Sequence, residues 1–142
     1  MKKIFIASDH AGFKLKKVVI NYLKKKKISI LDLGPSDDKK SVDYPKYAHK
    51  VSQKVSSRSS IFGILICGSG MGMSMAANKH KKIRAALCNN VKIAKLSRLH
   101  NNANIITLGS RLTNKKVALD CINTFLQTKF EGGRHLKRVK KI

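Results

Sequence analysis

The densest group of residues able to do chemistry is the run Cys67–Gly72, Cys-Gly-Ser-Gly-Met-Gly, which joins an apolar segment to a helical one. Glycines there let backbone N–H groups point into one concavity, and the start of a helix adds positive potential. We therefore expect the run to hold an anion or an oxyanion. It is neither a dinucleotide fingerprint, which would follow the first strand, nor a P-loop, because no Gly-Lys-Ser/Thr follows. Alone the pattern is weak, since a tight strand-to-helix turn explains it equally well.

Cys67 strengthens the functional interpretation, because a thiol that faces a helix start is shifted toward the thiolate. A thiolate can act as a nucleophile or as a base, whereas most free cysteines are small buried apolar residues. Cys88 and Cys121 lie on apolar stretches, and we expect both to be core residues. The three cysteines include no Cys-x-x-Cys pair and the five histidines no His-x-x-x-His pair, which argues against a structural zinc site or a disulfide framework.

Other titratable residues have two interpretations each. Asp9 and His10 follow the first apolar segment and can bind a hydroxyl or a phosphate, although capping of the next helix explains Asp9 equally well. His100 can act as an acid near neutral pH, although closure of a helix explains His100 and Asn101 too. Tyr44 can touch a substrate or merely pack at a helix start.

Three of the six arginines stand out, because the other 25 cations of the chain are lysines. Arg111 follows an apolar segment, and Arg134 and Arg138 are four residues apart, on one face if the tail is helical. A guanidinium matches phosphate oxygens in pairs. A solvated charge is the alternative, but a chain this rich in lysine would have supplied lysine. We therefore predict that these three arginines bind phosphate.

The elements that must position these residues alternate between strand and helix five times. Apolar, strand-like segments lie at 3–8, 28–33, 62–67, 83–87 and 105–108, with helical periodicity after each. Strands that are apolar throughout are typical of a parallel sheet with helices on both faces. We predict an α/β fold, a three-layer α/β/α sandwich around a five-stranded parallel Rossmann-like sheet, forming one domain over 1–142. Ligands of such folds bind beyond the carboxyl ends of strands, where Asp9, Cys67 and Arg111 fall.

The net charge of +24 raises a different possibility, nucleic-acid binding. Aromatic residues make up only 6% of the chain without a stacking cluster, and most lysines fall on the polar faces of helices. We therefore expect a solvated basic surface and no specific nucleic-acid partner. The chain has no apolar run of 18 residues and no signal-peptide pattern at its start, so we expect no membrane span and a cytoplasmic location.

Eight short motifs, in order, resemble ribose-5-phosphate isomerase type B, from Lys2 to about Val139. The wider family includes galactose-6-phosphate isomerase subunits and allose-phosphate isomerases. The motifs are SDHAGF at 8–13, DYP at 43–45, ICGSGMG at 66–72, AANK at 76–79, IRA at 83–85, SRLHN at 97–101, GSR at 109–111 and FEGGRH at 130–135. Together they are far more specific than any one of them.

The resemblance implies an aldose–ketose isomerase of the pentose phosphate pathway that interconverts D-ribose 5-phosphate and D-ribulose 5-phosphate through an enediolate. It implies that Cys67 takes the C2 proton, that Ser69 moves a proton between O1 and O2, and that His100 opens the furanose ring. It implies no metal and no cofactor, and a homodimer or homotetramer with sites shared between subunits. The implied substrate-binding residues are Asp9, His10, Tyr44, Gly68, Gly70, Met71, Gly72, Asn101, Arg111, Arg134 and Arg138.

Two departures from the family pattern bear on this assignment. Some members lack the cysteine and use a glutamate at the position of Met73, which cannot accept a proton, so this chain resembles the cysteine branch. Ser69 stands where some relatives have threonine, and the hydroxyl is kept. A galactose-6-phosphate or allose-6-phosphate isomerase subunit is the alternative function, because the depth of a sugar pocket depends on loop positions. A basic nucleic-acid-binding module is a more distant alternative.

Overall fold

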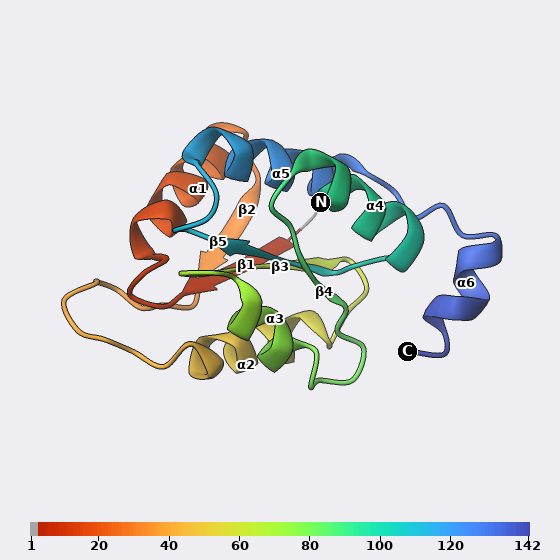
Figure 1. Ribbon diagram of the computed structural model, residues 1–142, viewed down its shortest axis with the longest axis horizontal. Helices are drawn as coiled ribbons and strands as arrows, with labels where there is room; N and C mark the ends of the chain where they lie inside the picture. Colours follow the sequence, from red (N-terminus) through yellow and green to blue (C-terminus); the bar gives the residue numbers. More distant parts are fainter. Residues whose placement is uncertain (1–2) are drawn as a thin grey trace.

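A sheet of five parallel strands forms the centre of the computed structural model, which describes residues 3–142 (Figure 1). All neighbouring strands pair in parallel, in the order β2-β1-β3-β5-β4. The predicted α/β fold with a five-stranded parallel Rossmann-like sheet is confirmed. The prediction of one domain over 1–142 includes Met1 and Lys2, which lie outside the described residues. The strands are β1 (Lys3–Ser8), β2 (Ser29–Asp32), β3 (Ile61–Cys67), β4 (Ala85–Leu87) and β5 (Ile105–Gly109).

Helices cover both faces of the sheet (Figure 1). One face carries α1 (Phe13–Lys25), α4 (Val91–Asn101) and α5 (Lys115–Gln127), and the other carries α2 (Tyr44–Val55) and α3 (Met71–Ala77). The path of the chain explains this division. The β1-to-β2 and β4-to-β5 connections run one way along the sheet, and the two connections between them run the other way. Crossovers of a single hand then place α1 and α4 on one face and α2 and α3 on the other.

Successive strand residues point into two separate cores, as the two-residue period of a strand requires. Ile64 and Ile66 face the core under α1, α4 and α5, whereas Leu65 and Cys67 face the core under α2 and α3. All seven residues of β3 are buried, which is why the strand reads as apolar throughout. Cys67 thus ends β3 with its side chain on the α3 side of the sheet.

The second and fourth strands are shorter than predicted. β4 begins at Ala85 rather than at 83, because the Arg84 N–H donates to the Asn104 side chain at 2.8 Å instead of joining a strand ladder. A last short helix, α6 (Arg134–Val139), follows α5 and contacts α4. Among residues 3–142, no helix combines the length and the apolar character needed to cross a membrane.

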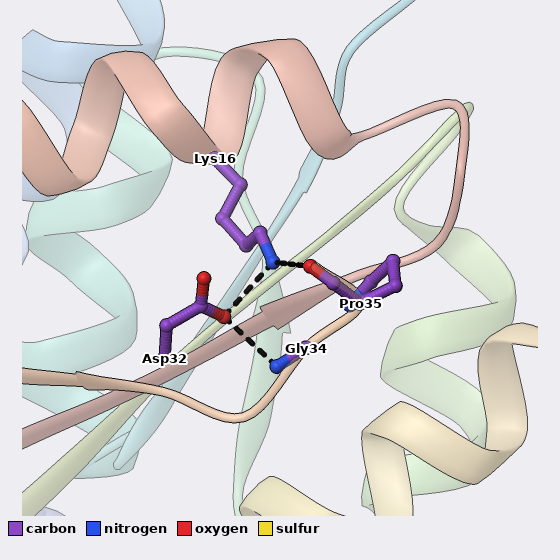
Figure 2. A network of polar contacts seen from close by, with 4 residues as sticks. All are labelled: Lys16, Asp32, Gly34 and Pro35. Carbon is purple, nitrogen blue, oxygen red and sulfur yellow. Dashed lines mark hydrogen bonds and ion pairs between the residues drawn. The ribbon is translucent and has the colours of Figure 1, made fainter. Parts of the chain in front are cut away.

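A buried lysine holds the segment that follows β2 (Figure 2). The Lys16 side chain in α1 is fully buried, and its Nζ donates to Asp32 Oδ1 at 2.9 Å and to the Pro35 carbonyl oxygen at 2.6 Å. The same Asp32 oxygen accepts the Gly34 N–H at 2.9 Å. This Lys16 network, formed by Lys16, Asp32, Gly34 and Pro35, joins α1 to the end of β2 and fixes the start of the 33–43 loop.

The chain leaves β1 and β3, two neighbouring strands, in opposite directions along the sheet. Parallel α/β sheets bind ligands in the crevice that this reversal opens at the carboxyl ends of the strands. The segments that follow the two strands begin with Asp9 and with Gly68.

Candidate active site

A pocket of about 390 Å³ lies at the carboxyl ends of β1 and β3. Its walls come from the segments after β1, β3 and β5 and from the first residues of α2 and α3. All of the lining residues except Leu112 were predicted from the sequence. They are Asp9, Tyr44, Cys67, Gly68, Ser69, Gly72, Arg111 and Leu112.

A second pocket of similar size, about 380 Å³, lies between α1 and α5 near the start of β1. Apolar side chains such as Leu23 and Leu126 line it, together with two lysines and two amides. It contains no histidine, cysteine or carboxylate, so the chemistry favours the first pocket.

The glycine run wraps around the sulfur of Cys67. Cys67 is 4% exposed, and its Sγ accepts the Gly70 N–H at 3.1 Å. Gly70 has a φ of +78°, and a Cβ there would lie 2.6 Å from Leu87 Cδ1, so both the backbone angle and the space require glycine. The Ser69 Oγ accepts the Met71 N–H at 3.2 Å. Backbone donors thus hold both the sulfur and the hydroxyl.

The segment after β5 fixes the glycine run from the other side. The Ser110 N–H donates to the Cys67 carbonyl at 2.8 Å, and the Arg111 N–H donates to the Gly68 carbonyl at 3.0 Å. These two bonds continue the pairing of β3 with β5 beyond the ends of the strands. Arg111 Nη1 lies 3.0 Å from the position that a Gly68 Cβ would occupy. The guanidinium therefore lies against the run, beside the pocket.

Asp9 and His10 are both held by backbone donors. Asp9 is 7% exposed, and its Oδ1 accepts the Gly12 N–H at 2.9 Å. Asp9 thus shapes the turn before α1 and also lines the pocket. It does not cap the helix, because the N-cap residue of α1 is Gly12 and no side chain bonds to the helix start. His10 Nδ1 accepts the Val42 N–H at 3.1 Å, which leaves Nε2 as the ring nitrogen that carries the hydrogen. The 33–43 loop, which the Lys16 network fixes, therefore orients His10.

Tyr44 lies directly on Gly72. A Cβ at Gly72 would be 2.4 Å from Tyr44 Cζ, so a larger residue would push the ring away. Because Tyr44 begins α2 and Gly72 is in the first turn of α3, this contact brings the starts of the two helices together at the pocket.

Four predicted site residues lie away from the pocket. His100 and Asn101 are the last residues of α4, which runs back from the carboxyl edge of the sheet and ends before β5 begins. Arg134 and Arg138 are on α6, at the right of Figure 1, whereas the loop after β2 extends to the left. One chain therefore forms two separate groups, the pocket and this remote group of His100, Asn101, Arg134 and Arg138.

Two residues to which the sequence analysis assigned no role, Glu131 and His135, lie beside the remote group. The Glu131 carboxylate Oε2 lies 3.7 Å from His100 Nε2 and 3.4 Å from His135 Nε2. The two imidazole rings stack with centroids 4.2 Å apart and an angle of 12° between planes. Burial lowers the pKa of His135, as do the neighbouring His100 and Arg134. The four-residue spacing of Glu131 and His135 is the one local signal for this contact, and no spacing in the sequence connects the pair to the distant His100.

Comparisons with known proteins agree with this architecture. Residues 4–142 match the family model described as Ribose/Galactose Isomerase. A putative sugar phosphate isomerase of Rickettsia bellii is 50% identical over 139 residues, covering 98% of this chain and 96% of that protein. A probable ribose-5-phosphate isomerase B of Mycoplasma pneumoniae is 47% identical over 139 residues, covering 98% and 91%. The crystal structure of ribose-5-phosphate isomerase B from Mycoplasma genitalium with bound ribulose-5-phosphate is 46% identical and has a TM-score of 0.95, covering 98% of this chain and 92% of that one. This chain therefore belongs to the ribose/galactose isomerase family.

Proposed function

We propose that this isomerase interconverts D-ribose 5-phosphate and D-ribulose 5-phosphate through an enediolate, as a cytoplasmic enzyme of the pentose phosphate pathway. The observation that carries the proposal is the Cys67 sulfur, which lines the pocket with the Gly70 N–H bonded to it. The pocket, about 390 Å³, lies within the usual range of about 300–1,000 Å³ for small-molecule sites. The Mycoplasma genitalium relative, which is 46% identical, holds ribulose-5-phosphate.

Cys67 acts as the base in this proposal. Its thiolate takes the proton from C2 of the open-chain aldose, and the electrons of that bond form the C1–C2 double bond while O1 becomes an oxyanion. Ser69 carries the O2 proton to O1. The proton on the sulfur then returns to C1, and O2 becomes the carbonyl oxygen of the ketose. The base is thereby regenerated and no atom is gained or lost.

Backbone N–H groups of the glycine run stabilise the oxyanion in this mechanism. Gly70 and Met71 already donate to the sulfur and to the Ser69 hydroxyl, so they hold the base and the proton carrier. The Gly72 N–H lies in the first turn of α3, where helical N–H groups have no partner within the helix. We assign the Gly72 N–H to the enediolate.

A second copy of the chain completes the site in our proposal. Ring opening needs His100 as the acid, with Asn101 beside it, and the phosphate needs Arg134 and Arg138 in addition to Arg111. Four of these residues lie in the remote group, so within one chain they do not meet Cys67. In a twofold dimer each pocket can face the remote group of its partner, which gives two complete sites.

Exposed apolar side chains support an association of this kind. Leu112, which lines the pocket, is 64% exposed, Met75 in α3 is 69% exposed, and Leu136 in α6, beside Arg134 and Arg138 in sequence, is 44% exposed. Large apolar side chains exposed at a surface are common where proteins contact one another. The proposal is therefore a homodimer, or a homotetramer built from such dimers.

The substitution Cys67→Ala tests the base. We expect isomerisation to fall by about 100- to 10,000-fold, the usual contribution of a general base, while the fold and the binding of a competing sugar phosphate are retained. Cys88→Ala is the matched control, since Cys88 is also buried but lies in the other core. A coupled assay of ketose formation measures the rates. Near-normal turnover of Cys67→Ala would show that another group removes the proton.

The sugar specificity needs its own measurement. The purified chain is assayed with ribose 5-phosphate, allose 6-phosphate and galactose 6-phosphate under the same conditions. We expect the largest kcat/KM for ribose 5-phosphate. A larger value for either six-carbon substrate would refute the five-carbon assignment without affecting the isomerase chemistry.

A further inference from the structure

The Glu131 carboxylate lies between two histidines, one at the end of α4 and one at the start of α6. Its Oε2 is 3.4 Å from His135 Nε2 and 3.7 Å from His100 Nε2. These separations exceed the roughly 2.7–3.2 Å of an N–H···O hydrogen bond, so each is a contact between charges rather than a hydrogen bond. Within residues 3–142, no other carboxylate forms an ion pair with a histidine.

Glu131 is also the only glutamate of the chain. The other six carboxylates are aspartates, and 31 residues are lysine or arginine. In a chain of this composition, the ordinary charged residue at an exposed position is a lysine. A single glutamate beside two histidines therefore indicates that a negative charge is needed at this point.

The backbone holds this carboxylate beside His100. The Glu131 N–H donates to the carbonyl of Leu99, the residue before His100, at 3.1 Å. Arg84 Nε donates to the carbonyls of Asn101 and Asn102 at 3.1 and 3.0 Å, which fixes the end of α4. The glutamate and the histidine thus belong to two segments that are tied together next to both residues.

His135 stacks on His100 and leaves the carboxylate to it. The two rings lie with their centroids 4.2 Å apart and 12° between their planes, and His135 is only 6% exposed. Burial lowers the pKa of His135, and His100, Arg134 and Arg138 lower it too, while Glu131 acts in the opposite direction. His135 is therefore a neutral ring near pH 7, and Glu131 can balance a positive charge on the ring stacked against it.

We propose that Glu131 is a positioning residue for ring opening, whose carboxylate holds the His100 ring against His135 and balances the charge of His100 in its acid form. This role rests on the proposed function, which makes His100 the ring-opening acid. Arg134, Arg138 and the net charge of +24 surround the site with positive charge. Removal of the carboxylate leaves protonated His100 next to these cations without compensation.

The role belongs to the assembled enzyme. In a single chain the side chains of His100 and Glu131 are 38% and 58% exposed, and contacts between charges as exposed as these contribute little. In the dimer of the proposed function, the pocket of the partner subunit covers them. Exclusion of water then strengthens the contact.

Ring opening assigns a separate task to each group. Glu131 lies beside Nε2 of His100, so Nδ1 is the ring nitrogen that delivers the proton. That proton goes to the ring oxygen of the furanose as the C1–O bond to this oxygen breaks. The electrons of the O1–H bond form the C1 carbonyl, and the proton of O1 goes to water. Glu131 exchanges no proton with the sugar.

Substitutions at position 131 separate its charge from its shape. Glu131→Gln keeps the size and removes the charge, whereas Glu131→Asp keeps the charge on a shorter side chain. We expect kcat with ribose 5-phosphate to fall by about 10- to 100-fold in Glu131→Gln, a part of the roughly 100- to 10,000-fold that a general acid contributes, and by a smaller factor in Glu131→Asp. Asp120→Asn, which removes the carboxylate of the exposed Lys116 ion pair, is the matched control and should keep the wild-type rate.

A double-mutant cycle tests whether Glu131 acts through His100. We expect Glu131→Gln to slow the wild type but to leave unchanged the residual rate of His100→Asn, measured where it is proportional to enzyme concentration. Urea unfolding confirms that each variant is folded. An equal loss in both backgrounds would refute the role, and so would a Glu131→Gln variant at least as active as Glu131→Asp, since a purely structural role favours the side chain of the same size.

Failure of the proposed function gives a different pattern. A wild-type chain without isomerase activity would refute the proposed function and the role of Glu131 together. An active wild type with a large loss in His100→Asn and no loss in Glu131→Gln would refute the role of Glu131 alone.

Discussion

At the scale of single residues, the three cysteines differ in what surrounds the sulfur. Cys67 lines a pocket that solutes can enter, whereas Cys88 and Cys121 have no exposed surface. Burial raises the pKa of Cys88 to about 12, and it also raises the pKa of Cys121. Only the thiolate is a strong nucleophile, so the two core cysteines are chemically inert while the chain is folded.

Alkylation of the native protein follows from this difference. With iodoacetamide near pH 8, we expect Cys67 to be modified first and bound sugar phosphate to protect it. A thiol with a pKa near 12 is ionised in only about one molecule in 10,000 at that pH, so Cys88 should react only after unfolding. Mass spectrometry of the digested protein identifies the modified residue. Equal labelling of Cys88 and Cys67 in the folded chain would contradict the prediction.

At the scale of elements, the connection between β2 and α2 depends on one buried charge. Lys16 links α1 to Asp32 and to the Pro35 carbonyl, and the loop that starts there ends with the Val42 N–H on His10. The network therefore supports both the packing of α1 and the orientation of a pocket residue.

Replacing the lysine should weaken the fold measurably. We expect Lys16→Met to lower the free energy of unfolding by about 2–3 kcal/mol, below the value of about 3–5 kcal/mol for a fully buried pair, because the Asp32 side chain is 39% exposed. Lys14→Met, an exposed change on the same helix, is the control and should have little effect. Urea unfolding measures both. Equal stability of the two variants would mean that the network contributes nothing net.

The contact between α2 and the turn that follows α3 should depend on pH. His49 Nδ1 and His80 Nε2 lie 2.7 Å apart, and partial burial and the neighbouring His49 lower the pKa of His80. The unfolded chain therefore binds this proton more readily than the folded one. The contribution to stability is present above the unfolded value near 6.5 and is lost as the pH falls through the lower folded value.

We therefore expect His80→Gln to be less stable than wild type near pH 8 and the difference to shrink near pH 5. Urea midpoints at the two pH values measure it. A difference that stays constant or grows on acidification would show that the pair does not titrate as described.

At the scale of the whole molecule, topology decides what the sequence can reveal. The elements were predictable because β3 is buried on both faces and the helices are amphipathic. Cys67 and Arg111 could be grouped because Cys67 ends β3 and Arg111 closely follows the end of β5, and parallel strands end at the same edge of a sheet. The separation of His100 from Cys67 depends instead on where α4 ends. The cluster of His100 with His135 depends on how α6 lies against α4, and no local pattern encodes that contact.

The arginines also fall into two classes when their positions in the whole molecule are compared. Arg98 is 7% exposed, lies over the rings of Phe62 and Phe125, and donates to the Ala103 carbonyl, so it stabilises the interior. Arg111 is the arginine at the pocket, and Arg134 and Arg138 are exposed on α6. Position rather than number therefore distinguishes the arginines that can reach a phosphate from those that hold the fold.

Mixed oligomers test whether two copies share a site. Cys67→Ala and His100→Asn should each be inactive with ribose 5-phosphate, but subunits mixed and reassociated in equal amounts should recover about a quarter of wild-type activity. Half of the dimers are then mixed, and each mixed dimer has one of its two sites intact. A coupled assay measures recovery, and differently tagged subunits confirm mixing. No recovery in a verified mixture would place the whole site within one chain.

Hydrogen bonds to backbone carbonyls join the turns around the pocket, as backbone hydrogen bonds join the strands of the sheet. The Asp9 N–H donates to the Ile66 carbonyl, the Ser110 N–H donates to the Cys67 carbonyl, and the Ser110 hydroxyl donates to the Ala11 carbonyl. The conformational entropy of this backbone is therefore lost when the chain folds, and ligand binding does not have to order it again. Capture of a sugar phosphate should therefore resemble the docking of a small anion on a rigid surface, with little loss of backbone entropy at the moment of contact.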